Sequence, residues 1–230
     1  MGKNYPAELR CIRKLLKPED ICFDVGAHSG SWSYPLSKVV SHVYAFEALP
    51  YYAQILGPTM SLLGARNVTV VNKAVSNRRD TVNLTWLDTS GKRLTGLTHV
   101  AAAGEQQGHA VSVATVSLDS FIAEENFAGK RVSFIKCDVE GYEYHVIAGA
   151  RRLITEWRPL IFAEAKDNWF ERYGKTSSNL IDILMSCDYS ANVIRLDGTV
   201  QEITAASYSG SGDILFCPVD KRIGRGAGNY

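Results

Sequence analysis

The stretch Ile21-Cys22-Phe23-Asp24-Val25-Gly26-Ala27-His28-Ser29-Gly30 decides the fold class. Its first half is a short, nearly continuous apolar run, which is typical of a strand buried on both faces. Gly26 and Gly30 then allow the backbone to turn sharply into a helix, which we expect over 31–40. A buried strand, a glycine turn and a helix begin a βαβ unit, so the stretch predicts a parallel sheet.

The same rhythm continues along the chain. Further helices are expected over 51–63, 146–154 and 180–185, and further apolar strands over 43–46, 68–71, 132–136, 160–163, 189–196 and 214–217. The rhythm pauses where segments 81–87 and 111–117 indicate an antiparallel hairpin around a glycine-dotted loop. The pattern predicts one α/β sandwich, with helices on both faces of a mostly parallel sheet and an inserted hairpin.

Length and composition fit a single globular domain over 1–230, since 46% of the residues are hydrophobic. Within it we expect an N-terminal helix in 1–17, a hairpin and loop insert over 78–118, and a flexible tail over 219–230. The five cysteines are scattered, which favours a reducing, cytoplasmic location. No apolar run approaches the roughly 18 residues that a membrane-spanning helix needs. A net charge of +1 argues against nucleic acid as a partner.

The glycine turn and the next strand together predict an adenosine-binding site. Amides at a helix start favour an anionic group, and Glu47, at the tip of the second strand, can accept two hydrogen bonds from a ribose diol. Ala27 and His28 stand where the dinucleotide fingerprint has its middle glycine. Asp24, two residues before Gly26, would repel a pyrophosphate and suit a cationic amine. These features favour S-adenosylmethionine (SAM), with its amine, sulfonium and ribose, over NAD.

A second polar cluster follows the fourth parallel strand. Lys136, Asp138 and Glu140 come at its C-terminal end, where open α/β sheets bind their ligands. Crowded carboxylates raise one another's pKa values and a lysine lowers them, and both effects suit acid–base chemistry. Glu164 ends the following strand and is expected at the same rim. Glu143 is better explained as an acid in the first turn of a helix, where the helix dipole favours it.

Four segments of the chain resemble the FkbM family of SAM-dependent methyltransferases. They are 24–30, 72–76, 117–119 and 134–143, and Glu164 and the segment 213–216 also fit. The most specific part is the K-x-D-x-E-G-x-E pattern over 136–143, and the resemblance runs from about residue 18 to residue 218. It implies a Rossmann-like class I methyltransferase fold with a seven-stranded sheet. It also implies methyl transfer, usually to an oxygen of a polyketide, sugar or other secondary metabolite.

The resemblance further implies which residues bind the cofactor. They are Asp24, Gly26, Ala27 and Gly30 at the methionine end, Glu47 at the ribose, Asn72, Ala74 and Val75 around the adenine, and Asp138 near the sulfonium, with Lys136 and Glu140 beside it. His28 departs from the family, which usually has Asn at that position. The family does not fix the acceptor.

Transfer to a hydroxyl requires removal of its proton, and the chain offers several groups for this step. Asp138 or Glu140 is the expected base, with His28 and His145 as rivals and Lys136 beside them. We expect no required metal, because clustered acids alone do not establish one.

Two other functions stay open at this point. An NAD-type oxidoreductase would use a similar sheet, and a non-catalytic module would keep the SAM pocket only for binding. The expected acceptor is a small molecule or glycan, and the sequence fixes neither oxygen against nitrogen transfer nor the oligomeric state. The segment 88–110 is a candidate lid or acceptor-recognition loop. Trp169, Phe170 and Tyr173 either wall an acceptor pocket or pack in the core.

Overall fold

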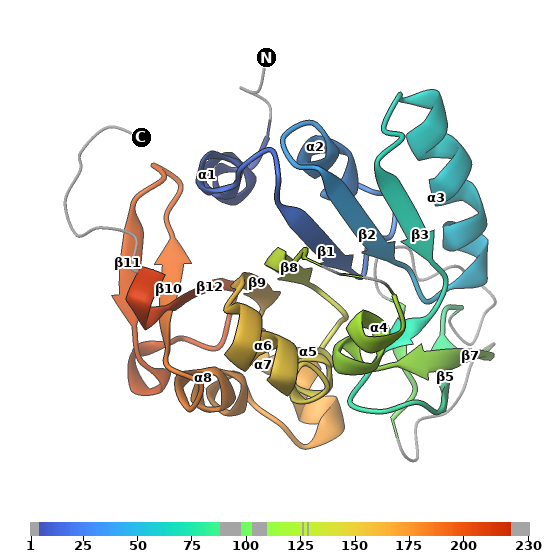
Figure 1. Cartoon of the computed structure of the whole chain (residues 1–230). Helices are drawn as coiled ribbons and strands as arrows, with labels where there is room; N and C mark the ends of the chain where they lie inside the picture. The colour runs from blue at the N-terminus through green and yellow to red at the C-terminus, as the bar shows by residue number, and fades with distance from the viewer. Residues whose placement is uncertain (1–4, 88–97, 103–109, 126, 128, 222–230) are drawn as a thin grey trace.

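The protein is built around an eight-stranded sheet in the order β11-β10-β12-β9-β8-β1-β2-β3 (Figure 1). The computed structural model describes residues 5–87, 98–102, 110–125, 127 and 129–221. The strands of this sheet are β1 (Ile21–Val25), β2 (His42–Phe46), β3 (Val68–Val71), β8 (Val132–Cys137), β9 (Leu160–Glu164), β10 (Tyr189–Ile194), β11 (Val200–Ile203) and β12 (Asp213–Pro218). The neighbours from β9 to β3 pair in parallel, whereas β9, β12, β10 and β11 pair antiparallel. The sheet is therefore mixed.

An eighth strand distinguishes this sheet from the seven-stranded sheet that the family resemblance implies. The chain turns at Asp197-Gly198, where the Gly198 N–H donates to the Arg195 carbonyl at 2.8 Å. It returns as β11, which pairs with β10 from Ile194↔Val200 to Ala191↔Ile203. Because β11 lies at the edge, it extends the antiparallel side and leaves the parallel strands around β1 unchanged.

Helices cover both faces of the sheet (Figure 1). One face packs against α1 (Ala7–Leu15), α2 (Ser33–Ser37) and α3 (Pro50–Leu62), and the other against α4 (Leu118–Glu124), α5 (Glu143–Ala148), α6 (Arg151–Trp157) and α8 (Ser177–Met185). Side chains alternate between these two cores along each strand, with Cys22 and Phe134 in the first and Phe23 and Ile135 in the second. No helix among the described residues is long and apolar enough to cross a membrane.

Two helices, α5 and α6, follow β8 where the sequence pattern predicts one. Gly149 lies between them, and a Cβ there would stand 2.2 Å from the carbonyl oxygen of Ser76. The carboxylate of Asp119 accepts the backbone N–H groups of Arg152 at 3.0 Å and Leu153 at 2.8 Å. Close packing at the glycine and this remote cap together interrupt the helix.

The insert and the short strand that precedes it form a second, smaller sheet beside the carboxyl ends of the parallel strands. Its order is β4-β7-β5-β6, with β4 (Ala74–Val75), β5 (Thr81–Thr85), β6 (His99–Val100) and β7 (Ala110–Val116). β5 and β7 form the expected antiparallel pair. Of the candidate lid segment 88–110, residues 88–97 and 103–109 lie outside the described residues. The described residues also include α7 (Asp167–Phe170) and the 3₁₀ helices Glu171–Tyr173, Ala205–Ser207 and Val219–Lys221.

Candidate active site

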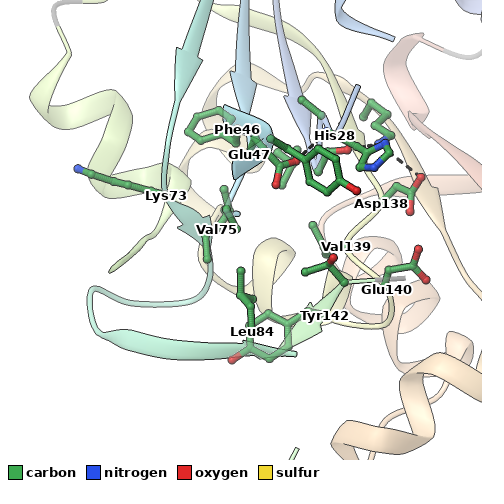
Figure 2. Close-up of a pocket in the computed structure, with 18 of the residues that line it drawn as sticks. His28, Phe46, Glu47, Lys73, Val75, Leu84, Asp138, Val139, Glu140 and Tyr142 are labelled. Atoms are coloured by element: carbon green, nitrogen blue, oxygen red, sulfur yellow. Dashed lines mark hydrogen bonds and ion pairs between the residues drawn. The ribbon is translucent and has the colours of Figure 1, made fainter. Parts of the chain in front are cut away.

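A cavity of about 230 Å³ lies where the parallel strands end (Figure 2). Loops after β1, β2, β3 and β8 form its walls, which is where an open α/β sheet binds ligands. The residues lining it that the sequence singles out are Gly26, Ala27, His28, Glu47, Ala74, Val75, Lys136, Asp138 and Glu140. Figure 2 shows Glu47 and Val75 on one side of the cavity and Asp138 and Glu140 on the other. Residues from distant parts of the chain thus meet in one place.

Asp24 does not line this cavity, although the sequence places it at the methionine end of the cofactor. Its carboxylate is 0% exposed, accepts the Ser33 hydroxyl at 2.5 Å and lies 3.6 Å from the ammonium of Lys136. Both partners belong to the protein, so Asp24 braces the wall of the cavity from behind. Asp24 therefore does not select a cationic amine over a pyrophosphate by direct contact, as the sequence argument had assumed.

Gly30 and Asn72, also expected at the cofactor, likewise stand outside the cavity lining. A Cβ on Gly30 would come 2.7 Å from Leu56 and from Met60 of α3, so the glycine lets the loop pack on that helix. The side-chain amide of Asn72 donates to the carbonyl of Glu47 at 2.8 Å. Asn72 thus holds the cavity-lining Glu47 in place, and Gly30 packs the loop onto α3.

The turn after β1 has a backbone that few residue types can adopt. Gly26 has φ of 79°, and a Cβ there would lie 1.9 Å from the carbonyl oxygen of Asp138. His28 also has positive φ, at 46°. Asn and His are both enriched in this left-handed conformation, so the His that replaces the family's usual Asn suits the same turn.

Glu47 is fixed at the cavity wall by two backbone amides. One carboxylate oxygen accepts the His28 N–H at 2.7 Å and the other accepts the Leu49 N–H at 2.8 Å. Burial raises the pKa of Glu47, and the two amides act in the opposite direction. Each oxygen keeps another lone pair, so the carboxylate can also accept hydrogen bonds from two neighbouring ligand hydroxyls.

Lys136 joins the turn after β1 to the loop after β8. Its ammonium donates to the Gly26 carbonyl at 2.9 Å and lies 3.4 Å from the carboxylate of Asp138 and 3.6 Å from that of Asp24. Burial lowers the pKa of Lys136, but the two carboxylates together raise it above its usual value. Two carboxylates around one ammonium leave a net negative charge, which favours a cationic ligand group nearby.

His28 offers a free ring nitrogen beside the cavity. Its ring lies edge-on to Tyr52, with centroids 4.3 Å apart, and its buried Nε2 has no hydrogen-bond partner among the described residues. Burial, and then the positive charge of Lys136, lower the pKa of His28. The imidazole is therefore neutral near pH 7, and Nε2 can face a ligand as a donor or an acceptor.

The acidic rim forms the other side of the site. A carboxylate oxygen from each of Asp138, Glu140 and Glu164 lies within 4.8 Å of the others. Burial, then repulsion from Glu164 and Asp138, raises the pKa of Glu140 to about 8. Burial and the charge of Asp138 also raise the pKa of Glu164. The sequence expectation that Glu164 joins Asp138 and Glu140 at one rim agrees with this arrangement.

The rest of the K-x-D-x-E-G-x-E pattern shapes the loop. Glu140 has φ of 56° and Gly141 has φ of 96°, and a Cβ on Gly141 would lie 2.5 Å from the Trp169 carbonyl oxygen. The buried Glu143, the first residue of α5, accepts the Val139 N–H at 2.7 Å. Burial raises the pKa of Glu143 well above its usual value. Gly141 and Glu143 thus set the path of the loop that presents Asp138 and Glu140.

Several residues line the cavity that sequence reasoning did not identify. They include Ser31, Trp32, Phe46, Ala48, Tyr52, Lys73, Leu84, Thr98, Val100, Val139 and Tyr142. Thr98 and Val100 come from the insert, so this segment helps form the cavity. Of the aromatic residues that follow Glu164, Phe170 is fully buried in the core, and neither Trp169 nor Tyr173 lines the cavity. Tyr173 instead donates its hydroxyl hydrogen to the Val100 carbonyl at 2.7 Å.

Solved structures of methyltransferases share this fold. The FkbM methyltransferase from Methylobacillus flagellatus KT is 17% identical with a TM-score of 0.54; the match covers 88% of this chain and 44% of that one, so the chain spans less than half of its length. An rRNA methylase from Streptococcus thermophilus is 11% identical with a TM-score of 0.51, and the match covers 94% of this chain and 96% of that one. A candidate methyltransferase from Streptococcus mutans, solved in complex with SAH, is 8% identical with a TM-score of 0.52. That match covers 93% of this chain and 98% of the other. These low identities show a shared fold.

No curated protein matches the chain significantly. The model of the methyltransferase FkbM domain matches residues 24–191, well over half of the sequence. This match includes the turn after β1, the tip of β2 and the acidic rim. The chain therefore belongs to the FkbM methyltransferase domain family.

Proposed function

We propose that this protein is a SAM-dependent methyltransferase that methylates a hydroxyl oxygen of a small molecule or glycan. The observation that carries the proposal is Glu47, a carboxylate held at the cavity wall by two backbone amides beside the glycine turn. This placement suits the ribose diol of an adenosine cofactor. One neighbour of the same fold was solved in complex with SAH, the demethylated product of SAM.

In the proposed complex, the adenine lies near Ala74 and Val75, the ribose on Glu47, and the methionine end along Gly26 and Ala27. The sulfonium then faces Asp138. The net negative charge of Asp138, Asp24 and Lys136 stabilises that cation more than a neutral thioether. We place His28 beside the methionine end as a hydrogen-bond partner.

The acceptor enters beside Asp138 and Glu140. An oxygen lone pair forms the new bond to the methyl carbon, while the carbon–sulfur bond breaks and its electron pair stays on sulfur. The carboxylate of Asp138 or Glu140 accepts the hydroxyl proton. Cavity and rim supply the alignment that this in-line displacement needs, because SAM is already an activated donor. A small acceptor agrees with the net charge of +1, which offers no strong attraction to a polynucleotide.

Calorimetric titration with SAM, SAH and NAD tests the proposal. SAM and SAH should bind and NAD should not. Glu47→Ala should weaken SAM binding by about 10- to 100-fold, because two hydrogen bonds to a charged acceptor are lost. Glu156→Ala, an exposed change on α6, is the matched control and should bind normally. Binding of NAD in preference to SAM, or unchanged SAM binding by Glu47→Ala, would overturn the proposed cofactor site.

A further inference from the structure

One side of the cavity stays open once the proposed cofactor lies along the strand ends. Figure 2 shows Leu84 and Tyr142 on this side, across the cavity from Glu47. Val100, which also lines the cavity, pairs directly opposite Leu84 in the β5–β6 register. We call Leu84, Val100 and Tyr142 the apolar wall. A molecule lying on this wall would face the cofactor.

The ring of Tyr142 is fixed as a flat surface. It stacks on His145, with ring centroids 4.1 Å apart and the planes 11° from parallel. The centroid of Tyr173 lies 5.1 Å from that of Tyr142 and 6.2 Å from that of His145, and its ring stands at 77° to both. These distances place Tyr173 beside the stacked pair, so neither ring covers the face of Tyr142 that points away from His145. That face can receive another flat ring.

The apolar wall suits carbon better than hydroxyl groups. The side chains of Leu84 and Val100 carry no polar atom. The Val100 carbonyl already accepts the Tyr173 hydroxyl at 2.7 Å, a bond that also ties the insert to the stacked rings. A sugar ring on this wall would bury hydroxyls against carbon, at a cost of roughly 1–3 kcal/mol for each one left unpaired. An aromatic ring needs no such partners there.

A carboxyl group suited to a phenol lines the same cavity. Glu140 lies two residues before Tyr142. Burial, then repulsion from Glu164 and Asp138, raises the pKa of Glu140 to about 8. A base of this strength accepts the proton of a phenol, with a pKa of about 10, far more readily than that of an aliphatic hydroxyl, which ionises much nearer to the value of about 15.7 for water.

We propose that the acceptor is a phenol whose ring stacks on Tyr142 and whose hydroxyl points to Glu140. This class of acceptor rests on the proposed methyltransferase function and narrows it. The Glu140 carboxylate takes the phenolic proton, and a lone pair of the same oxygen forms the bond to the methyl carbon. The carbon–sulfur bond breaks and its electron pair stays on sulfur, so the products are an aryl methyl ether and SAH.

Saturation-transfer nuclear magnetic resonance on the SAH-bound full chain tests the site without turnover. The probes are phenol, its saturated analogue cyclohexanol and methyl glucoside, at equal concentrations. Saturation should pass mainly to phenol. Tyr142→Ala should reduce that signal by about fivefold because the stacking partner is lost, whereas Tyr142→Phe keeps the ring and should retain it. Tyr5→Ala, a change outside the cavity lining, is the matched control and should behave as the natural chain does.

SAH titration of the same variants separates the acceptor site from the cofactor site. Tyr142→Ala should bind SAH as the natural chain does, which also shows that it is folded. A parallel loss of SAH affinity would assign Tyr142 to the cofactor and overturn the proposal. So would a signal for cyclohexanol or methyl glucoside that equals the phenol signal, or an undiminished phenol signal in Tyr142→Ala. SAH binding without phenol binding overturns the acceptor class alone, whereas failure of the natural protein to bind SAH overturns the proposed function and the acceptor class with it.

Discussion

Replacing Lys136 with methionine should reduce the stability of the folded protein more than any change on its surface. The side chain is 5% exposed, and methionine has a similar length but lacks the charge. The change strands Asp24, which is 0% exposed and would keep only the Ser33 hydroxyl as a side-chain donor. It also removes the hydrogen bond from the ammonium to the Gly26 carbonyl.

The size of the effect follows from the distances. Coulomb's law at the observed 3.6 Å between Lys136 and Asp24 gives about 5 kcal/mol at an effective dielectric constant of about 20. Removing Lys136 also removes the free-energy cost of burying its charge. The net loss of stability is therefore smaller than the summed energies of its contacts. Removing one member of a buried pair typically costs about 3–5 kcal/mol, and we expect Lys136→Met to lower the free energy of unfolding by that amount.

Urea unfolding of four proteins measures the effect: the natural chain, Lys136→Met, Asp24→Asn and the double variant. The double variant should be more stable than Lys136→Met alone, because the stranded charge is gone. A loss below about 1 kcal/mol for Lys136→Met, or no recovery in the double variant, would refute the idea that Lys136 neutralises a buried charge.

Three further changes have defined outcomes. Gly26→Ala should abolish SAM binding, measured by calorimetry, because the new Cβ would meet the Asp138 carbonyl oxygen at 1.9 Å; retained affinity would contradict the observed turn. Asp119→Ala should cost about 1–2 kcal/mol in urea unfolding but leave SAM affinity unchanged, because it uncaps α6 away from the cavity. Burial raises the pKa of Glu143 in the folded protein well above 4.5, its value in the unfolded chain. The protonated carboxyl therefore stabilises the folded protein at low pH, and this stabilisation is lost as pH rises from 4.5 through the pKa of folded Glu143. The stability of Glu143→Gln relative to the natural chain should therefore rise between about pH 5 and the pKa of folded Glu143, by at most about 1.4 kcal/mol per pH unit, and a constant difference in urea midpoints would count against this protonation.

The parallel strands could be predicted because each is an apolar run, and residues 68–71 form β3 with the expected bounds. The break between α5 and α6 could not, because it depends on Gly149 meeting Ser76, a residue far away in the sequence. The edge strand β11 was also hidden, since Val200–Ile203 is short and partly polar. Local pattern identifies elements, whereas their ends and edges depend on distant contacts.

The meeting of Glu47, Lys136 and Asp138 at one cavity follows from the rule that parallel strands end at the same edge. Asp24 lies within β1, where side chains alternate between the two faces, and its side chain turns away from the cavity toward Ser33. Tyr52, on α3, and Thr98, in the insert, line the cavity through tertiary contacts that no short motif encodes. The sequence thus predicts the cavity residues at strand ends, whereas it does not predict the lining residues that come from helices and from the insert.

A crystal structure of the protein with SAH bound tests the central claim most directly. The ribose hydroxyls should lie within hydrogen-bond distance of the Glu47 carboxylate, with the adenine beside Val75 and the sulfur facing Asp138. Density for SAH outside this cavity, or a ribose with no contact to Glu47, would contradict the proposed cofactor site.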